Sequence, residues 1–212
     1  MHDLTAMLPL LKNGGKTRFH YSAGNKYVTR LKLRFRNTGQ SIRPTSITRL
    51  FTGGKFNLSY NGKYEPLSVD IPATAKKVEI LAHISGHGWG SDIENCAEFC
   101  NHTHHFSVNG TEFMHDQPWV GKMYGCAEQV PMGTVPNQYG TWTIGRAGWC
   151  PGKEVTPFIA DVTAEVTPGE TATITYKGLF DGQDYEPKAD PNGNSNGFGA
   201  NIWMESWLVV YE

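Results

Sequence analysis

The chain has 212 residues, including 24 glycines and 12 prolines, and a formal net charge of -1 at pH 7. This length allows one large β domain or two small ones. Basic residues are scattered along the chain rather than gathered in one stripe, so we expect neither nucleic acid nor an anionic membrane as a partner. No segment approaches the ~18 consecutive apolar residues of a membrane-spanning helix.

Two segments near the beginning of the chain have the alternation typical of β-strands. They are Thr17–Tyr21 and Tyr27–Phe35; in the second, basic side chains alternate with apolar or uncharged ones. Such alternation places one set of side chains on a buried face and the other in water. Polar residues, Gly39 and Pro44 then interrupt the pattern, which predicts a domain boundary near residue 40.

Short strand-like segments separated by turns fill the rest of the chain. They are Thr45–Phe51, Phe56–Tyr60, Tyr64–Val69, Lys77–Ile84, Thr103–Val108, Phe158–Val166, Thr171–Tyr176 and Ile202–Val210. Asn61-Gly62 and Asn109-Gly110 are strong hairpin signals, because both positions tolerate a positive φ. Helical periodicity is limited to a turn near Leu8–Leu11. We therefore expect an all-β, antiparallel, two-sheet sandwich of jelly-roll type, with function carried by its loops.

Four cysteines lie between residues 96 and 150, and their spacing favours the local pairs Cys96–Cys100 and Cys126–Cys150. The first pair would stabilise the fold by only about 2 kcal/mol and the second by about 3.5 kcal/mol. Disulfides imply an oxidising compartment, so we expect a secreted or periplasmic protein. Four free thiols in a cytosolic protein are the alternative. Because the first residues lack the features of a signal peptide, we expect the natural start to lie upstream.

The most informative stretch runs from residue 85 to residue 105 and contains Cys96-Ala97-Glu98-Phe99-Cys100. A disulfide across these five residues would hold the Glu98 carboxylate in one orientation, as a catalytic or ligand-orienting acid requires. Glu98 could instead be a solvated loop acid or a structural salt-bridge partner of Arg146, and Arg146 could simply brace the disulfide loop.

Several blocks of the sequence resemble the C-terminal domain of peptide-N-glycosidase F in order and spacing. They are Ile84-Ser85-Gly86, Cys96–Cys100, Thr103-His104, Asn109, Phe113 and, most specifically, Arg146-Ala147-Gly148-Trp149-Cys150-Pro151-Gly152. The resemblance implies a jelly-roll domain over residues 41–212, and it makes residues 1–40 terminal strands of a preceding jelly-roll domain. It also implies hydrolysis of the amide between the innermost N-acetylglucosamine and asparagine of N-glycoproteins, without a cofactor.

The resemblance assigns catalytic roles to Glu98, which matches a glutamate inside a small disulfide ring, and to Arg146, which matches an arginine of the same cleft. We expect contacts with the N-glycopeptide or glycoprotein substrate from a further set, namely Ser85, His87, Trp89, Asp92, His104 and Trp149. The principal catalytic aspartate of the family lies in an N-terminal segment that these 212 residues lack. A separate or missing N-terminal domain is therefore expected to complete the enzyme.

Amide hydrolysis needs an activated water, a proton donor for the leaving nitrogen and a group that stabilises negative charge. Glu98 and Arg146 can supply two of these functions. A second carboxylate would have to come from Asp92, Glu94 or Asp116, none of which has an identifying spacing.

The histidines offer another kind of site. His102 and His104 are two residues apart on a predicted strand and share one face, and His115 could join them to hold zinc or copper. We expect hydrogen-bonding histidines beneath the cleft instead, and no bound metal. Three functions thus remain: an N-glycan amidase, a non-catalytic glycan-binding or accessory module, and a His-ligated metalloprotein.

Overall fold

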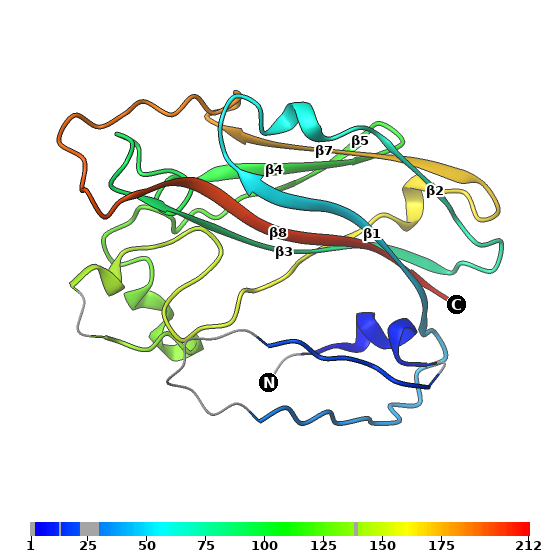
Figure 1. The fold of residues 1–212 in the computed structure, drawn as a ribbon. Coiled ribbons are helices and arrows are strands. Elements are labelled where there is room, and N and C mark those ends of the chain that lie inside the picture. Colours follow the sequence, from blue (N-terminus) through cyan, green and yellow to red (C-terminus); the bar gives the residue numbers. More distant parts are fainter. Residues whose placement is uncertain (1–2, 13, 22–29, 138–139) are drawn as a thin grey trace.

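The computed structural model describes all residues except 1–2, 13, 22–29 and 138–139. Two four-stranded antiparallel sheets lie face to face (Figure 1). The strands are β1 (Pro44–Lys55), β2 (Leu67–Asp70), β3 (Lys77–Trp89), β4 (His102–Val108), β5 (Thr111–His115), β6 (Phe158–Asp161), β7 (Thr171–Phe180) and β8 (Phe198–Tyr211). Five short 3-10 helices complete the described elements: η1 (Thr5–Leu10), η2 (Asn61–Lys63), η3 (Ala127–Met132), η4 (Gly140–Thr143) and η5 (Thr163–Glu165).

One sheet has the strand order β1-β8-β3-β6 and is called here the β8 sheet; the other has the order β2-β7-β4-β5 and is called the β7 sheet. β1, β2, β3 and β4 alternate between the two sheets, which is the arrangement of a jelly roll. The expected all-β jelly-roll sandwich is therefore confirmed. No helix in the described parts of the chain is long and apolar enough to cross a membrane.

The core lies between the two sheets and follows from strand alternation. On β3 and β8 every second side chain points inward, including the fully buried Ile80, Ile202 and Leu208. Phe106 of β4 meets them from the β7 sheet and is also fully buried. The opposite side chains of β3 and β8 point away from the core, and η1 lies beside β1 of the same sheet (Figure 1).

The two hairpin signals have different outcomes. Asn109 and Gly110 have φ values of 49° and 94° and join β4 to β5, as expected. Asn61-Gly62 instead begins η2. The strand expected before it, at Phe56–Tyr60, is wrong. That segment is a turn in which the Asn57 carboxamide oxygen accepts from the Ser59 N–H, while the Phe56 ring is buried. A local side-chain hydrogen bond and an aromatic anchor thus replace strand pairing.

The expectation of strands before residue 40 is also wrong in the part that the structure describes. Residues 14–21 and 30–43 have no strand, and Tyr27–Thr29 of the second predicted strand lie outside the described residues. Phe19, Leu31 and Phe35 are exposed. Alternation produces a strand only where another strand pairs with the backbone, and among the described residues no strand pairs with either segment. The boundary near residue 40 remains a prediction.

Candidate active site

Both expected disulfides are present, Cys96–Cys100 and Cys126–Cys150. The ring closed by Cys96–Cys100 contains Glu98, whose carbonyl oxygen accepts from the Ala147 N–H at 2.9 Å. The Ala147 carbonyl oxygen in turn accepts from the N–H of Gly86 on β3, also at 2.9 Å. Backbone hydrogen bonds therefore tie the ring, the segment before Cys150 and β3 into one unit.

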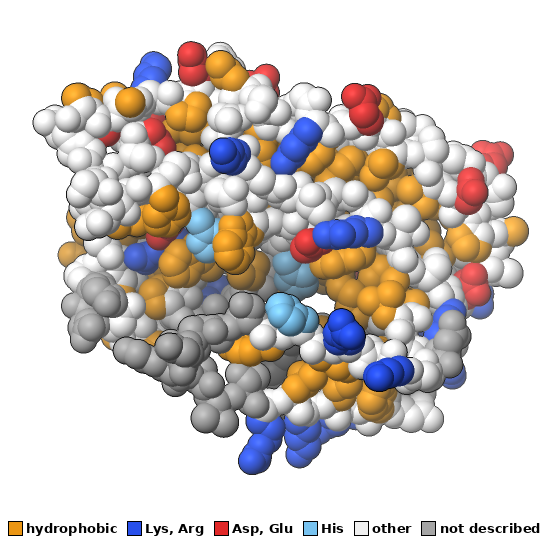
Figure 2. Space-filling model, viewed as in Figure 1, with side chains coloured by type: hydrophobic (Ala, Val, Ile, Leu, Met, Phe, Trp, Pro, Cys, Tyr) orange, Lys and Arg blue, Asp and Glu red, His pale blue; other side chains and the backbone are white. Residues whose placement is uncertain are grey.

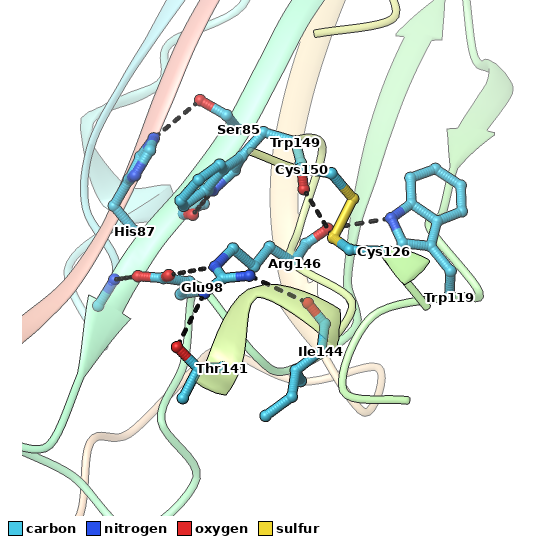
Figure 3. Close-up of polar contacts among 12 residues, drawn as sticks. Ser85, His87, Glu98, Trp119, Cys126, Thr141, Ile144, Arg146, Trp149 and Cys150 are labelled. Atoms are coloured by element: carbon cyan, nitrogen blue, oxygen red, sulfur yellow. Dashed lines mark hydrogen bonds and ion pairs between the residues drawn. A yellow bond between two sulfur atoms is a disulfide. The ribbon is translucent and has the colours of Figure 1, made fainter. Parts of the chain in front are cut away.

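Glu98 and Arg146 form a buried ion pair at the centre of this unit (Figure 3). Arg146 Nε donates to Glu98 Oε1 at 2.9 Å, and the Gly88 N–H donates to Glu98 Oε2 at 3.3 Å. Both charged residues are only 6% exposed. The remaining guanidinium nitrogens donate to the Ile144 carbonyl and to Thr141 Oγ1 at 3.2 and 3.4 Å. Glu98 is therefore not a solvated loop acid, because every contact holds its carboxylate in one position.

Burial raises the pKa of the Glu98 carboxyl, whereas the hydrogen bonds from Gly88 and Arg146 and the positive charge of Arg146 act in the opposite direction. The net direction is upward. Burial therefore outweighs the stabilisation of the charged form by its hydrogen-bond and ion-pair partners.

Aromatic rings cover the cationic side of the pair. The Arg146 guanidinium lies 4.9 Å from the centre of the Trp149 ring, whose Nε1–H donates to the Gly86 carbonyl at 2.9 Å. The His87 ring stacks on the Trp149 ring, with ring centroids 5.3 Å apart. Ser85 Oγ lies 3.0 Å from His87 Nε2. The structure therefore brings Ser85, His87 and Trp149 together with Glu98 and Arg146.

Trp203 is a neighbour that sequence reasoning missed. Its ring lies 5.0 Å from that of His87, across the pairing of β8 with β3. Within the predicted last strand Trp203 alternates with the buried Ile202 and Met204, so its place on the outer face was available from the pattern.

The Asp92 side chain is buried within the fold rather than open to solvent. It is 2% exposed, and its Oδ1 accepts from the Tyr185 hydroxyl at 2.6 Å and from the Cys96 N–H at 3.3 Å. Asp92 therefore holds the beginning of the ring, and its hydrogen bonds give it a structural role there. Glu94 and Asp116 are exposed, and no second carboxylate contacts Glu98 among the described residues. Trp89 is partly buried at the end of β3, where it pairs with Phe198.

His104 is fully buried, so the expected direct contact between His104 and substrate is wrong. It belongs to a hydrogen-bonded series beneath the ring. His102 Nε2 lies 3.0 Å from the Ala97 carbonyl, and His102 Nδ1 lies 2.8 Å from His104 Nε2. His104 Nδ1 lies 2.7 Å from the Tyr176 hydroxyl, which is 3.0 Å from that of Tyr60. This arrangement is called here the histidine relay.

The donors and acceptors along the histidine relay can be assigned. Burial lowers the pKa of His102 to about 4 and that of His104 well below its usual value, so both rings are neutral at neutral pH. A carbonyl only accepts, so His102 Nε2 carries the hydrogen and His102 Nδ1 must accept from His104 Nε2–H. His104 Nδ1 then accepts from Tyr176. These four ring nitrogens all take part in hydrogen bonds. The described residues contain no cluster of three potential metal ligands.

Nitrogen-15 NMR of the histidine rings is expected to show hydrogen on Nε2 and none on Nδ1 for both His102 and His104. The pattern should persist when the pH falls below the usual pKa of histidine, because burial opposes protonation. Tyr176→Phe should release the tautomer of His104, whereas Tyr211→Phe, whose hydroxyl bonds Glu79 outside the relay, should not. Hydrogen on Nδ1 of either ring in the unmodified protein would contradict the assigned direction.

Residues 55–209 match the family described as "Peptide-N-glycosidase F, C terminal", which is well over half of the chain. The chain belongs to this family. A curated relative, peptide-N(4)-(N-acetyl-beta-D-glucosaminyl)asparagine amidase F from Elizabethkingia miricola, is 31% identical over 114 residues, which are 52% of this chain and 30% of that protein.

Solved structures of peptide-N-glycosidase F share the fold. A crystal structure of peptide-N(4)-(N-acetyl-beta-D-glucosaminyl)asparagine amidase has a TM-score of 0.58 and 20% identity, covering 79% of this chain and 52% of that one. The enzyme from Flavobacterium meningosepticum has a TM-score of 0.51 and 22% identity, covering 78% and 51%. This peptide-N-glycosidase F domain thus spans about half of the solved chains and less of the curated relative.

Proposed function

We propose that this chain is the C-terminal part of an N-glycan amidase. The reaction would hydrolyse the amide between the innermost N-acetylglucosamine and the asparagine of an N-glycopeptide or glycoprotein. The observation that carries the proposal is the buried Glu98–Arg146 pair, held by the disulfide ring and flanked by His87 and Trp149. The name of the curated relative, an asparagine amidase, supports the same reaction.

The proposed chemistry follows the charges of the pair. Water adds to the amide carbonyl, the C–N bond breaks, asparagine becomes aspartate and the nitrogen leaves with the sugar. Arg146 would stabilise the negative charge that develops on oxygen, and Glu98 would position the innermost sugar or transfer a proton. Trp149 presents an aromatic surface suited to the apolar face of a pyranose, and His87 and Ser85 would supply polar contacts.

A non-catalytic glycan-binding module is the second candidate. One observation favours it: no second carboxylate contacts Glu98 within the described part of the chain. In the amidase proposal this missing carboxylate comes from an N-terminal domain. The two disulfides support a secreted or periplasmic location for either function.

A glycopeptide deamidation assay tests the proposal, with conversion of the glycosylated asparagine to aspartate measured by mass spectrometry. Residues 1–212 alone are expected to bind the chitobiose end weakly and to release glycan slowly or not at all. Joining the chain to the N-terminal domain of a full-length relative should restore cleavage.

The outcomes separate the two candidates. Binding without cleavage in the combined protein would favour the glycan-binding module and contradict the amidase. Rapid cleavage by residues 1–212 alone would instead show that the second carboxylate is local, and exposed Glu94 and Asp116 would be the first to replace.

A further inference from the structure

We propose that a groove on the outer face of the β8 sheet is a second saccharide subsite, in which Trp203 stacks on a neutral pyranose ring. The inference rests on the proposed function, because it places the sugars that follow the innermost chitobiose. It extends the candidate active site, because Ser85 borders both places while Thr52, Asn201 and Glu205 of the groove do not contact the Glu98–Arg146 pair.

The groove has the size and composition of a ligand site. Its volume is about 460 Å³, within the usual range for small-molecule pockets, and β1, β3 and β8 supply most of its walls. Ser85, Asn201, Trp203 and Glu205 are among its lining residues. Figure 2 shows hydrophobic and histidine side chains near a hollow on this side of the molecule.

The lining matches a sugar rather than an ion. Trp203 is 66% exposed, so its indole face is open to the C–H face of a pyranose. Glu205 is already paired with Arg49, which donates to it at 2.6 to 2.9 Å. The one carboxylate among the lining residues is therefore neutralised by a partner. The carboxamide of Asn201 and the hydroxyl of Thr52 offer donors and acceptors of the kind that sugar hydroxyls need.

Ring contacts connect the groove to the candidate active site. The Trp203 ring lies 5.0 Å from His87, and His87 lies 5.3 Å from Trp149. Trp149 in turn covers the Arg146 guanidinium at 4.9 Å, beside Glu98. A saccharide whose innermost residue lies at Glu98 can thus extend over His87 and reach Trp203 without leaving this face of the sheet.

Binding of two free glycans to residues 1–212 tests the subsite. The probes are chitobiose and the core pentasaccharide, which carries three mannoses on chitobiose, and affinities are measured by calorimetry. The pentasaccharide is expected to bind about tenfold more tightly than chitobiose, an increment of the size that one stacked ring supplies. Trp203→Ala should abolish this increment and leave the affinity for chitobiose unchanged.

Tyr124→Ala is the matched control, because Tyr124 is an exposed aromatic residue that does not line the groove. Equal affinities for the two probes, or an increment that survives Trp203→Ala, would overturn the subsite. If Trp203→Ala changed neither affinity but prevented an added N-terminal domain from restoring cleavage, Trp203 would belong to a domain interface, which also overturns it. Failure of the amidase proposal appears separately, as absent cleavage while the pentasaccharide increment persists.

Discussion

Replacing Glu98 by glutamine in the chain joined to an N-terminal domain is expected to lower kcat/KM for glycopeptide deamidation by about 10²–10⁴-fold, the range for loss of a positioned acid or base. Glutamine keeps the size of the side chain and an oxygen that can accept from Arg146 or Gly88, so the ring should keep its shape. It loses the exchangeable proton and the charge. Because Glu98→Gln also leaves the buried Arg146 charge without its partner, urea unfolding of this variant is measured as well, and kcat/KM is compared under conditions in which both proteins are folded.

Glu94→Gln is the control for the same loop, since Glu94 is exposed and contributes nothing to the pair. It should have nearly the activity of the unmodified protein. Full activity of Glu98→Gln, with glycan release and aspartate formation unchanged, would remove this carboxyl from the mechanism and leave the disulfide ring a structural feature.

Replacing Arg146 by methionine is expected to destabilise the chain by about 3–5 kcal/mol at neutral pH, as breaking a buried ion pair typically does. The reason is the uncompensated charge left on Glu98, whose side chain stays buried among the atoms of the ring. Urea unfolding, followed by circular dichroism, measures the change. The double variant Glu98→Gln, Arg146→Met should recover much of the loss, because no buried charge remains.

The pH dependence gives a second check on this variant. Arg146 lowers the pKa of the Glu98 carboxyl, so its removal should raise that pKa further. A folded-state pKa above the unfolded value favours folding when the group is protonated, and this contribution is lost as the pH rises through the folded-state pKa. The deficit of Arg146→Met should therefore shrink in mildly acidic solution and grow toward neutral pH.

Arg49→Met is the control for an exposed pair. Arg49 and Glu205 are largely exposed, with side-chain exposures of 60% and 46%, and such pairs contribute about 0–1 kcal/mol. A comparable loss for both arginine variants would contradict the special cost of the buried site.

The sequence predicted the sandwich because strand alternation and turn residues are local signals. The predicted segments overlap β3, β4, β7 and β8, although β3 and β8 extend beyond the segments predicted for them. The strand expected at Phe56–Tyr60 failed because a β-like composition also suits a turn whose aromatic residue is buried. Thr17–Tyr21 failed because a strand depends on partners that the pattern itself cannot reveal.

The candidate site was predictable where residues are close in sequence or share a recognisable motif. Glu98 within its ring and Arg146 beside Cys150 are of this kind. The burial of Asp92 and His104 was not, because it depends on Tyr185 and Tyr176, which are remote in the chain. Trp203 was overlooked for a similar reason: its proximity to His87 comes from the pairing of β8 with β3.

The position of β8 has a consequence for the order in which the molecule forms during translation. β8 is the last strand in the sequence, yet it pairs with both β1 and β3 in the middle of its sheet. The β7 sheet can form once residue 180 has emerged from the ribosome, whereas β1 and β3 must wait with unpaired edges that are prone to aggregation. The surface that bears His87 and Trp203 is therefore completed only after β8 has emerged, and nascent chains that stall before residue 198 should depend most on chaperones.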